Sequence, residues 1–159
     1  MPVMSRGGDL SCSRPSGESV TDDRPRPLNT TVREQMRRMP REGTSPELAL
    51  RRELHRRGLR FRVNYREVPG RPDIALTRAR IAVFMDGCFW HLCPVHGGVP
   101  VNNREWWRAK LNRNVERDRE KDESLRERGW LPLHYWEHDE VDEIADEVEM
   151  VWRWRVPGP

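Results

Sequence analysis

The chain has 159 residues, of which 35% are charged and 35% hydrophobic, and its mean hydropathy is −0.93. This length fits one domain of ordinary size with loose ends and excludes a second large domain. The longest apolar stretches, such as residues 81–85, fall far short of the roughly 18 apolar residues that a spanning helix needs, which excludes membrane insertion. No apolar segment follows a charged N-terminus, so we expect no secretory signal and a cytoplasmic protein.

Positive charge is concentrated in the first half of the chain. Residues 1–80 carry 18 arginines and 10 acidic residues, whereas residues 81–159 carry 11 basic and 16 acidic residues, so the net charges are +8 and −5. Arg guanidinium groups suit phosphate oxygens and base edges, which favours nucleic acid as the partner. A solvated surface that reflects an Arg-rich coding bias explains the composition equally well.

The N-terminal segments lack the patterning of a folded domain. Residues 1–30 are rich in Ser, Gly, Pro, Asp and Arg without apolar periodicity, which predicts a disordered leader that includes Cys12. Residues 31–43 form a basic arm, in which residues 31–39 favour one or two helical turns that end before Pro40, or a plain linker. The folded domain is expected over residues 44–155.

The folded domain begins with a predicted helix. Ser45 is suited to the N-cap, Pro46 to the first turn and Gly58 to the C-terminal stop, while Leu50 and Leu54 are spaced four residues apart on one face. The pattern then predicts three short strands in a meander, over residues 59–65, 72–77 and 80–85. After them it predicts a long helix over residues 104–128, a fourth strand over 130–136 and a closing amphipathic helix over 141–151. The predicted fold class is therefore α/β, a mixed α+β sheet in the order α-β-β-β-α-β-α.

An acidic residue stands where a turn enters the second predicted strand. Asp73 follows Pro69-Gly70-Arg71-Pro72, and a carboxylate fixed at a strand start can bind Mg²⁺, which polarises a phosphodiester and activates water. Asp beside Pro and Gly is also ordinary turn chemistry. Asp73 is therefore either a metal ligand or a turn residue.

Residues 84–96 hold the densest group of metal-capable side chains. Three cysteines in the chain are too few and too unevenly placed for a disulfide framework. Cys88, Cys93 and His96 instead offer three zinc ligands within nine residues, and His138 is the best candidate for the fourth. The alternative is a pair of buried free thiols with surface histidines.

The same loop and the long predicted helix hold further candidates. Phe89 and Trp90 are either core residues or wedges between base pairs. Asp118 borders the inward face of the helix and can orient His91 as a general base by accepting its ring N–H, unless it serves only as a surface ion-pairing residue.

Taken together, these stretches resemble the very-short-patch-repair endonucleases, which are mismatch-specific DNA nicking enzymes. The match covers about residues 33–140 and includes QMRRM at 35–39, TSPE at 44–47, PGRPD at 69–73, VFMDGCFWHLCPVH at 83–96, WW at 106–107 with Lys110, NVERD at 114–118, GW at 129–130 and WE at 136–137. The predicted element order, with an acid at the start of the second strand, is that of a restriction-endonuclease-like core.

The resemblance implies an enzyme that cuts 5′ of the T in a T:G mismatch, with catalytic Mg²⁺ and a structural zinc. By this pattern Asp73 and the backbone carbonyl of Met85 would ligate Mg²⁺, and Glu47 would hold metal-bound water. Asp86 and His91 would complete the site, with His91 as the base and Asp118 as its orienting partner.

The zinc ligands and DNA contacts follow from the same resemblance. Zinc would fall on Cys88, Cys93, His96 and His138, where the residue after Trp136-Glu137 is often Cys in the family and is His138 here. Phe89, Trp90 and Trp107 would form an aromatic wedge beside the mismatch, and Met36 or Met39 of the arm would enter from the other groove. Further contacts with DNA would come from Arg37, Arg38, Lys110 and Asn114.

The leading hypothesis is a Mg²⁺-dependent endonuclease that acts as a monomer on double-stranded DNA containing a mismatch. A zinc-stabilised DNA-binding module without cleavage is the first alternative, although such a module needs none of the carboxylates. A nicking nuclease used in restriction or phage defence is the second.

Overall fold

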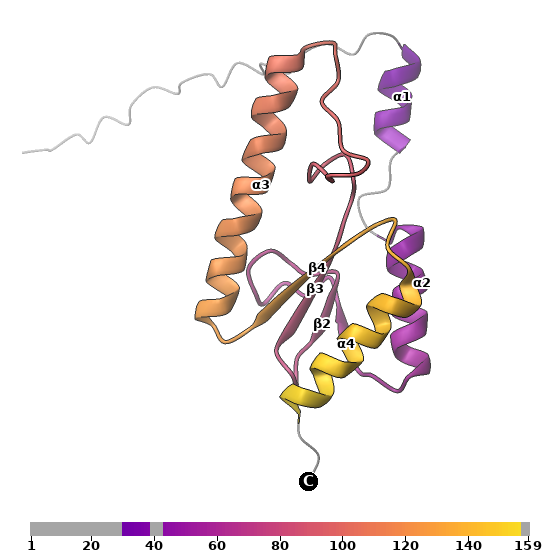
Figure 1. Ribbon diagram of the computed structural model, residues 1–159, viewed down its shortest axis with the longest axis vertical. Helices are drawn as coiled ribbons and strands as arrows, with labels where there is room; N and C mark the ends of the chain where they lie inside the picture. Colours follow the sequence, from indigo (N-terminus) through magenta and orange to yellow (C-terminus); the bar gives the residue numbers. More distant parts are fainter. Residues whose placement is uncertain (1–29, 39–42, 157–159) are drawn as a thin grey trace, which may run out of the picture.

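The computed structural model describes residues 30–38 and 43–156, and it combines helices with one four-stranded sheet (Figure 1). The elements are, in chain order, α1 (Thr30–Arg38), α2 (Ser45–Arg56), β1 (Arg62–Val63), β2 (Ile74–Leu76), β3 (Ile81–Asp86), α3 (Arg104–Glu127), β4 (Leu131–Trp136) and α4 (Val141–Arg155). From α2 onward this is the predicted order. The predicted leader, up to residue 29, lies outside the described residues, as does Met39 of the arm.

The sheet has the strand order β1-β2-β3-β4. The first three strands pair antiparallel, which confirms the predicted meander, whereas β4 returns through α3 to pair parallel with β3. In the parallel pair Met85 faces Tyr135 and Asp86 faces Trp136, so both strands end at the same edge. Loops that follow β3 and β4 therefore meet there.

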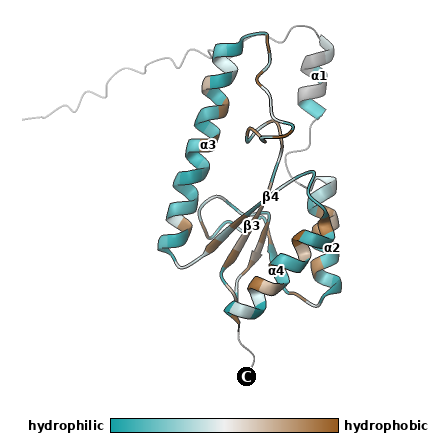
Figure 2. Cartoon of the chain, in the orientation of Figure 1, coloured by the Kyte–Doolittle hydropathy of each residue, from teal (hydrophilic) through white to brown (hydrophobic). Residues whose placement is uncertain are grey.

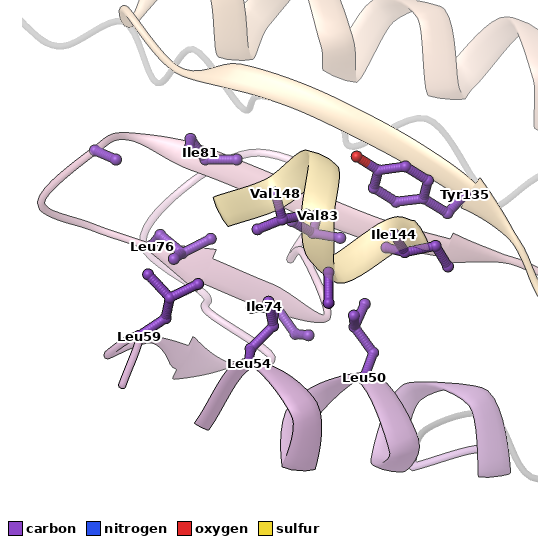
Figure 3. Close-up of a cluster of buried hydrophobic side chains, with 12 residues drawn as sticks. Leu50, Leu54, Leu59, Ile74, Leu76, Ile81, Val83, Tyr135, Ile144 and Val148 are labelled. Atoms are coloured by element: carbon purple, nitrogen blue, oxygen red, sulfur yellow. The ribbon is translucent and has the colours of Figure 1, made fainter. Parts of the chain in front are cut away.

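Helices cover both faces of the sheet. Leu50 and Leu54 of α2 pack with Ile144 and Val148 of α4 against the face that carries Val83 (Figure 3). On the other face Ala82 and Phe84 pack with Leu125 of α3. Alternation along β3 thus sends successive side chains to two separate cores.

The start of α2 differs from its prediction by one residue. The N-cap is Thr44 rather than Ser45, which is the first helical residue. Glu47 explains the shift, because its carboxylate accepts hydrogen bonds from the Gly43 amide and the Thr44 hydroxyl and so fixes the chain ahead of the helix. Gly58, with φ of +79°, ends the helix as predicted.

The first strand is much shorter than predicted. Only Arg62–Val63 is extended and paired, and Val63 is 44% exposed, whereas Leu59 is buried and Phe61 is half-buried. Asn64 has φ of +48°, which turns the chain immediately after the pair. The alternating pattern over residues 59–65 therefore indicated a longer ladder than the backbone allows.

The inward stripe predicted for α3 is only partly correct. Leu111 and Leu125 are fully buried, whereas Trp107 and Val115 are half-buried. The N-terminal part of α3 extends past the sheet, and most of its surface is hydrophilic (Figure 2). Its aromatic residues therefore pack against the loop after β3 instead of a core. Every helix among the described residues is too short or too polar to cross a lipid bilayer.

Candidate active site and metal centre

The candidate catalytic side chains come from five segments of the chain that meet where β3 ends. Asp86 is the last residue of β3, His91 lies in the loop after it, and Asp118 lies in the middle of α3. Asp73 directly precedes β2, and because β2 runs antiparallel to β3, its start lies beside the end of β3. Glu47 contributes from the first turn of α2.

Asp73 reaches across to the neighbouring strand. Its Oδ2 accepts a hydrogen bond of 2.9 Å from the Met85 amide. Burial, together with the charges of Glu47 and Asp86, raises the pKa of Asp73 to about 6, against the opposing effects of the Met85 amide and Arg51. The raised pKa shows that nearby positive charge compensates this carboxylate only in part. A bound metal ion would supply the missing positive charge.

Glu47 is the one charged residue that is fully buried among the described residues, with 4% of its surface exposed. Besides its bonds to the start of α2, its Oε2 accepts a hydrogen bond of 3.0 Å from Arg51. These contacts hold the carboxylate rigidly within electrostatic reach of Asp73.

His91 and Asp118 are in direct contact, as predicted. Nδ1 of His91 lies 2.7 Å from Oδ2 of Asp118, whose other oxygen accepts from Lys121 at 2.9 Å. Burial lowers the pKa of His91, but Asp118 and Asp86 favour the imidazolium and outweigh burial, so the pKa of His91 is raised. Burial raises the pKa of Asp118, but its contacts with His91 and Lys121 outweigh burial and lower that pKa to about 2. The carboxylate occupies Nδ1, so Nε2 is the ring nitrogen left to exchange a proton.

An aromatic cluster lies beside this pair. The ring of Phe89 lies 4.9 Å from that of Trp90 and 5.3 Å from that of Trp107, and all three are half-buried. Trp106 extends the cluster and carries the Lys110 ammonium over its face at 5.4 Å. Half-burial means that these rings are neither a closed core nor fully solvated.

Asn114, a predicted DNA contact, uses its side-chain amide to connect α3 to the loop after β3. Its Nδ2 donates to the Trp90 carbonyl at 3.3 Å. On the arm, Arg37 and Arg38 are exposed at the end of α1. The predicted methionine wedge falls outside what the structure describes, both for Met39 and for the side chain of Met36.

Cys88, Cys93, His96 and His138 converge on one point. One ligand atom from each lies within 4.8 Å of all the others, and no other such group occurs in residues 30–38 and 43–156. Sγ of Cys88 lies 3.1 Å from Nδ1 of His138, and the Nδ1 atoms of the two histidines lie 3.3 Å apart.

These spacings, with 3.9 Å between Sγ of Cys88 and Nδ1 of His96, are close to those around a single tetrahedral ion. Zinc–sulfur bonds of about 2.3 Å and zinc–nitrogen bonds of about 2.0 Å place neighbouring ligand atoms roughly 3.3–3.8 Å apart. Burial raises the pKa of the Cys88 thiol to about 12, so its thiolate form requires a nearby cation. The group therefore has the composition and compactness of a candidate metal site, and His138 lies with the three loop residues.

Sequence reasoning missed His134, which contacts Asp86 and Asp122 through its two ring nitrogens. It lies mid-strand, outside every motif, and only its alternation with the buried Tyr135 places it on the face toward α3.

Comparison with known proteins identifies the family. A sequence profile described as DNA mismatch endonuclease Vsr matches residues 29–95, the stretch that holds Glu47, Asp73 and His91. The Type II nicking enzyme V.NaeI of Lentzea aerocolonigenes is 45% identical over 129 residues, which cover 78% of this chain and 78% of that protein. The chain belongs to the DNA mismatch endonuclease Vsr family.

Two further relatives agree with this assignment. The DNA mismatch endonuclease Vsr of Escherichia coli strain K12 is 40% identical over 104 residues, which cover 64% of this chain and 66% of that protein. The Type II nicking enzyme V.NmeDIP of Neisseria meningitidis serogroup C is 39% identical over 107 residues, which cover 63% and 69%. As a Vsr-family member the protein is an endonuclease that acts on DNA, and the resemblance noted from its motifs is confirmed.

Proposed function

We propose that the protein is a Mg²⁺-dependent endonuclease that nicks one strand of duplex DNA 5′ of the T in a T:G mismatch. The observation that carries the proposal is the contact of His91 with Asp118 beside Asp73 and Asp86, next to a half-buried aromatic cluster. This combines a proton acceptor, carboxylates for a cation and rings able to stack on bases. The element order also fits a restriction-endonuclease-like core, and we propose that the protein acts as a monomer.

Oxygen donors at the end of β3 fit Mg²⁺. The Asp73 carboxylate lies against Met85, whose backbone carbonyl points to the same side as its amide, toward β2. The residue that would face Met85 if the β2–β3 ladder continued is Pro72, which has no N–H to donate to that carbonyl. When bound between these oxygens, Mg²⁺ would polarise the phosphodiester and lower the pKa of nearby water, with Glu47 holding a water of its shell.

His91 supplies the base. Nε2 takes the proton from water as the water oxygen bonds to phosphorus, one P–O ester bond breaks, and the departing oxygen gains a proton from solvent. Asp118 stabilises the imidazolium that forms and keeps the proton of Nδ1 in place. Lys121 holds Asp118 in turn.

Mismatch selection falls to the aromatic cluster. Phe89, Trp90 and Trp107 stack at a weakly paired step, where unstacking costs least. Cys88, Cys93, His96 and His138 would hold a structural zinc, which would fix the loop that carries Phe89 and Trp90. Met36 or Met39 would enter from the other groove while Arg37, Arg38, Lys110 and Asn114 contact the DNA.

The cellular setting has a second candidate. V.NaeI and V.NmeDIP are named Type II nicking enzymes, which favours a nicking role attached to restriction and defence rather than general repair. A binding module without cleavage is disfavoured, because it needs neither the His91–Asp118 pair nor a carboxylate whose pKa is raised by burial.

A nicking assay on end-labelled duplexes tests the proposal. A panel with each single mismatch and a fully paired control, with the label on either strand, is incubated with and without Mg²⁺. We expect one nick in the T strand of T:G duplexes only with Mg²⁺, and its loss in His91→Ala. His55→Ala, on the exposed side of α2, is the matched control. Equal cutting of paired DNA, cutting of both strands, or nicking without divalent ions would contradict the proposal.

A further inference from the structure

His134 of β4 makes two carboxylate contacts that no motif in the sequence indicates. Its Nδ1 lies 2.7 Å from Oδ2 of Asp86, and its Nε2 lies 2.9 Å from Oδ1 of Asp122. An ionised carboxylate only accepts hydrogen bonds, so both ring nitrogens need a proton to satisfy both contacts. The geometry therefore requires an imidazolium cation between two acids.

The electrostatics agree with that geometry. Burial lowers the pKa of His134, but the hydrogen bond and charge of Asp86, followed by those of Asp122, outweigh burial and raise the pKa to about 9. The ring is consequently charged at neutral pH.

Asp86 connects this cation to the candidate active site. While Oδ2 of Asp86 accepts from His134, Oδ1 lies 3.8 Å from Nδ1 of His91, the atom that contacts Asp118. Only 13% of the Asp86 side chain is exposed, so solvent screens these interactions incompletely. Acid and base thus alternate from Asp122 through His134, Asp86 and His91 to Asp118.

Strand pairing fixes the orientation of the His134 ring. Phe84 faces His134 in the β3–β4 register, and the two rings stack with centroids 4.8 Å apart at 15°. The Phe84 ring sits tightly under the turn at Gly70, where a Cβ atom would lie only 3.1 Å from it. The cation is therefore held by backbone pairing and a packed ring rather than by a freely rotating side chain.

We propose that His134 is a positioning residue of the nicking reaction, a permanent imidazolium that holds Asp86 toward His91 and offsets negative charge where the DNA phosphate approaches. The inference rests on the proposed function. Without the cation, Asp86 would lose the bond that orients it, and the negative charge of Asp86 and Asp122 would be offset less where a polyanion approaches, with Asp122 left to its pairing with Arg126 at 3.2 Å. Because this acts on the reacting geometry, the loss should fall on kcat more than on KM.

Four variants test the proposal in the Mg²⁺-dependent nicking assay. His134→Gln removes the charge, His134→Arg restores a charge with two donors, and Asp122→Asn removes only the partner remote from the active site. His55→Gln, exposed on α2, is the matched control. We expect kcat to fall about tenfold or more in His134→Gln with KM changed less than about threefold, a smaller fall in Asp122→Asn, and partial recovery in His134→Arg.

Nitrogen-15 NMR of the histidine rings supplies a readout independent of activity. We expect both nitrogens of His134 to be protonated at neutral pH in the full-length protein. A neutral His134 ring, wild-type kcat in His134→Gln, or equal losses in His134→Gln and His134→Arg would each overturn the proposal. If His134→Gln does not fold, the NMR result and the kcat of Asp122→Asn test the proposal instead. A wild-type kcat in Asp122→Asn would then overturn the proposal. If the wild-type protein nicks no duplex, the proposed function itself is wrong. If the wild-type protein nicks and substitution of His134 has no effect, only the role of His134 is wrong.

Discussion

Replacing Asp73 with Asn should stabilise the fold while abolishing nicking. Burial, Glu47 and Asp86 raise the pKa of this carboxyl from its ordinary 3.8 to about 6, so the folded protein holds the ionised form at a cost of about 3 kcal/mol at neutral pH. Asn keeps an oxygen to accept the Met85 amide and carries no charge. The variant should therefore gain up to about 3 kcal/mol in free energy of unfolding above pH 6.

The sign of the pH dependence distinguishes this effect from a change in packing. A raised folded-state pKa means that the contribution of wild-type Asp73 to stability is fully present below about pH 4 and is lost as pH rises through about 6. The difference between Asp73→Asn and wild type should thus be near zero at acidic pH and largest at neutral pH.

Urea unfolding of both proteins in parallel, in the absence of divalent ions, measures this difference, since groups distant from Asp73 titrate alike in the two. Added Mg²⁺ should then stabilise wild type and leave Asp73→Asn unchanged. A variant equal to or less stable than wild type at neutral pH would show that Asp73 is a turn residue whose charge carries no energetic cost, contrary to this prediction.

Other predictions address the metal centre, the aromatic cluster and the arm. Purified protein should contain one zinc, and strong chelators should lower its melting temperature; full zinc retention in His138→Ala would show that the fourth ligand lies elsewhere. Trp90→Ala should weaken binding to T:G duplexes more than to paired duplexes, by about 1–3 kcal/mol for a lost stacking contact, in competition assays. Equal losses on both duplexes would make Trp90 a packing residue. Deleting residues 1–42 should reduce affinity and flatten its salt dependence, whereas deleting residues 1–28 should change neither; a loss of activity in the shorter deletion would contradict the arm boundary.

Sequence patterning predicted the order of elements well because the signals are local. The spacing of Leu50 and Leu54 indicated α2, and Gly58 marked its end, since helix periodicity and a left-handed stop act within a few residues. The same local reading overextended the first strand, because ladder length depends on a partner strand and on the turn at Asn64.

By itself the sequence determined the identity of the chemical groups and the family to which they belong. The ligands Cys88, Cys93 and His96 lie in one short loop, so their meeting required only chain proximity. How distant groups meet depends on the tertiary structure: parallel pairing of β4 with β3 across the 24 residues of α3 brings His138, a candidate from its residue type, to that loop and His134 to Asp86. No periodicity in β4 encodes those contacts, because strand register is set by packing on both faces of the sheet rather than by neighbours along the chain.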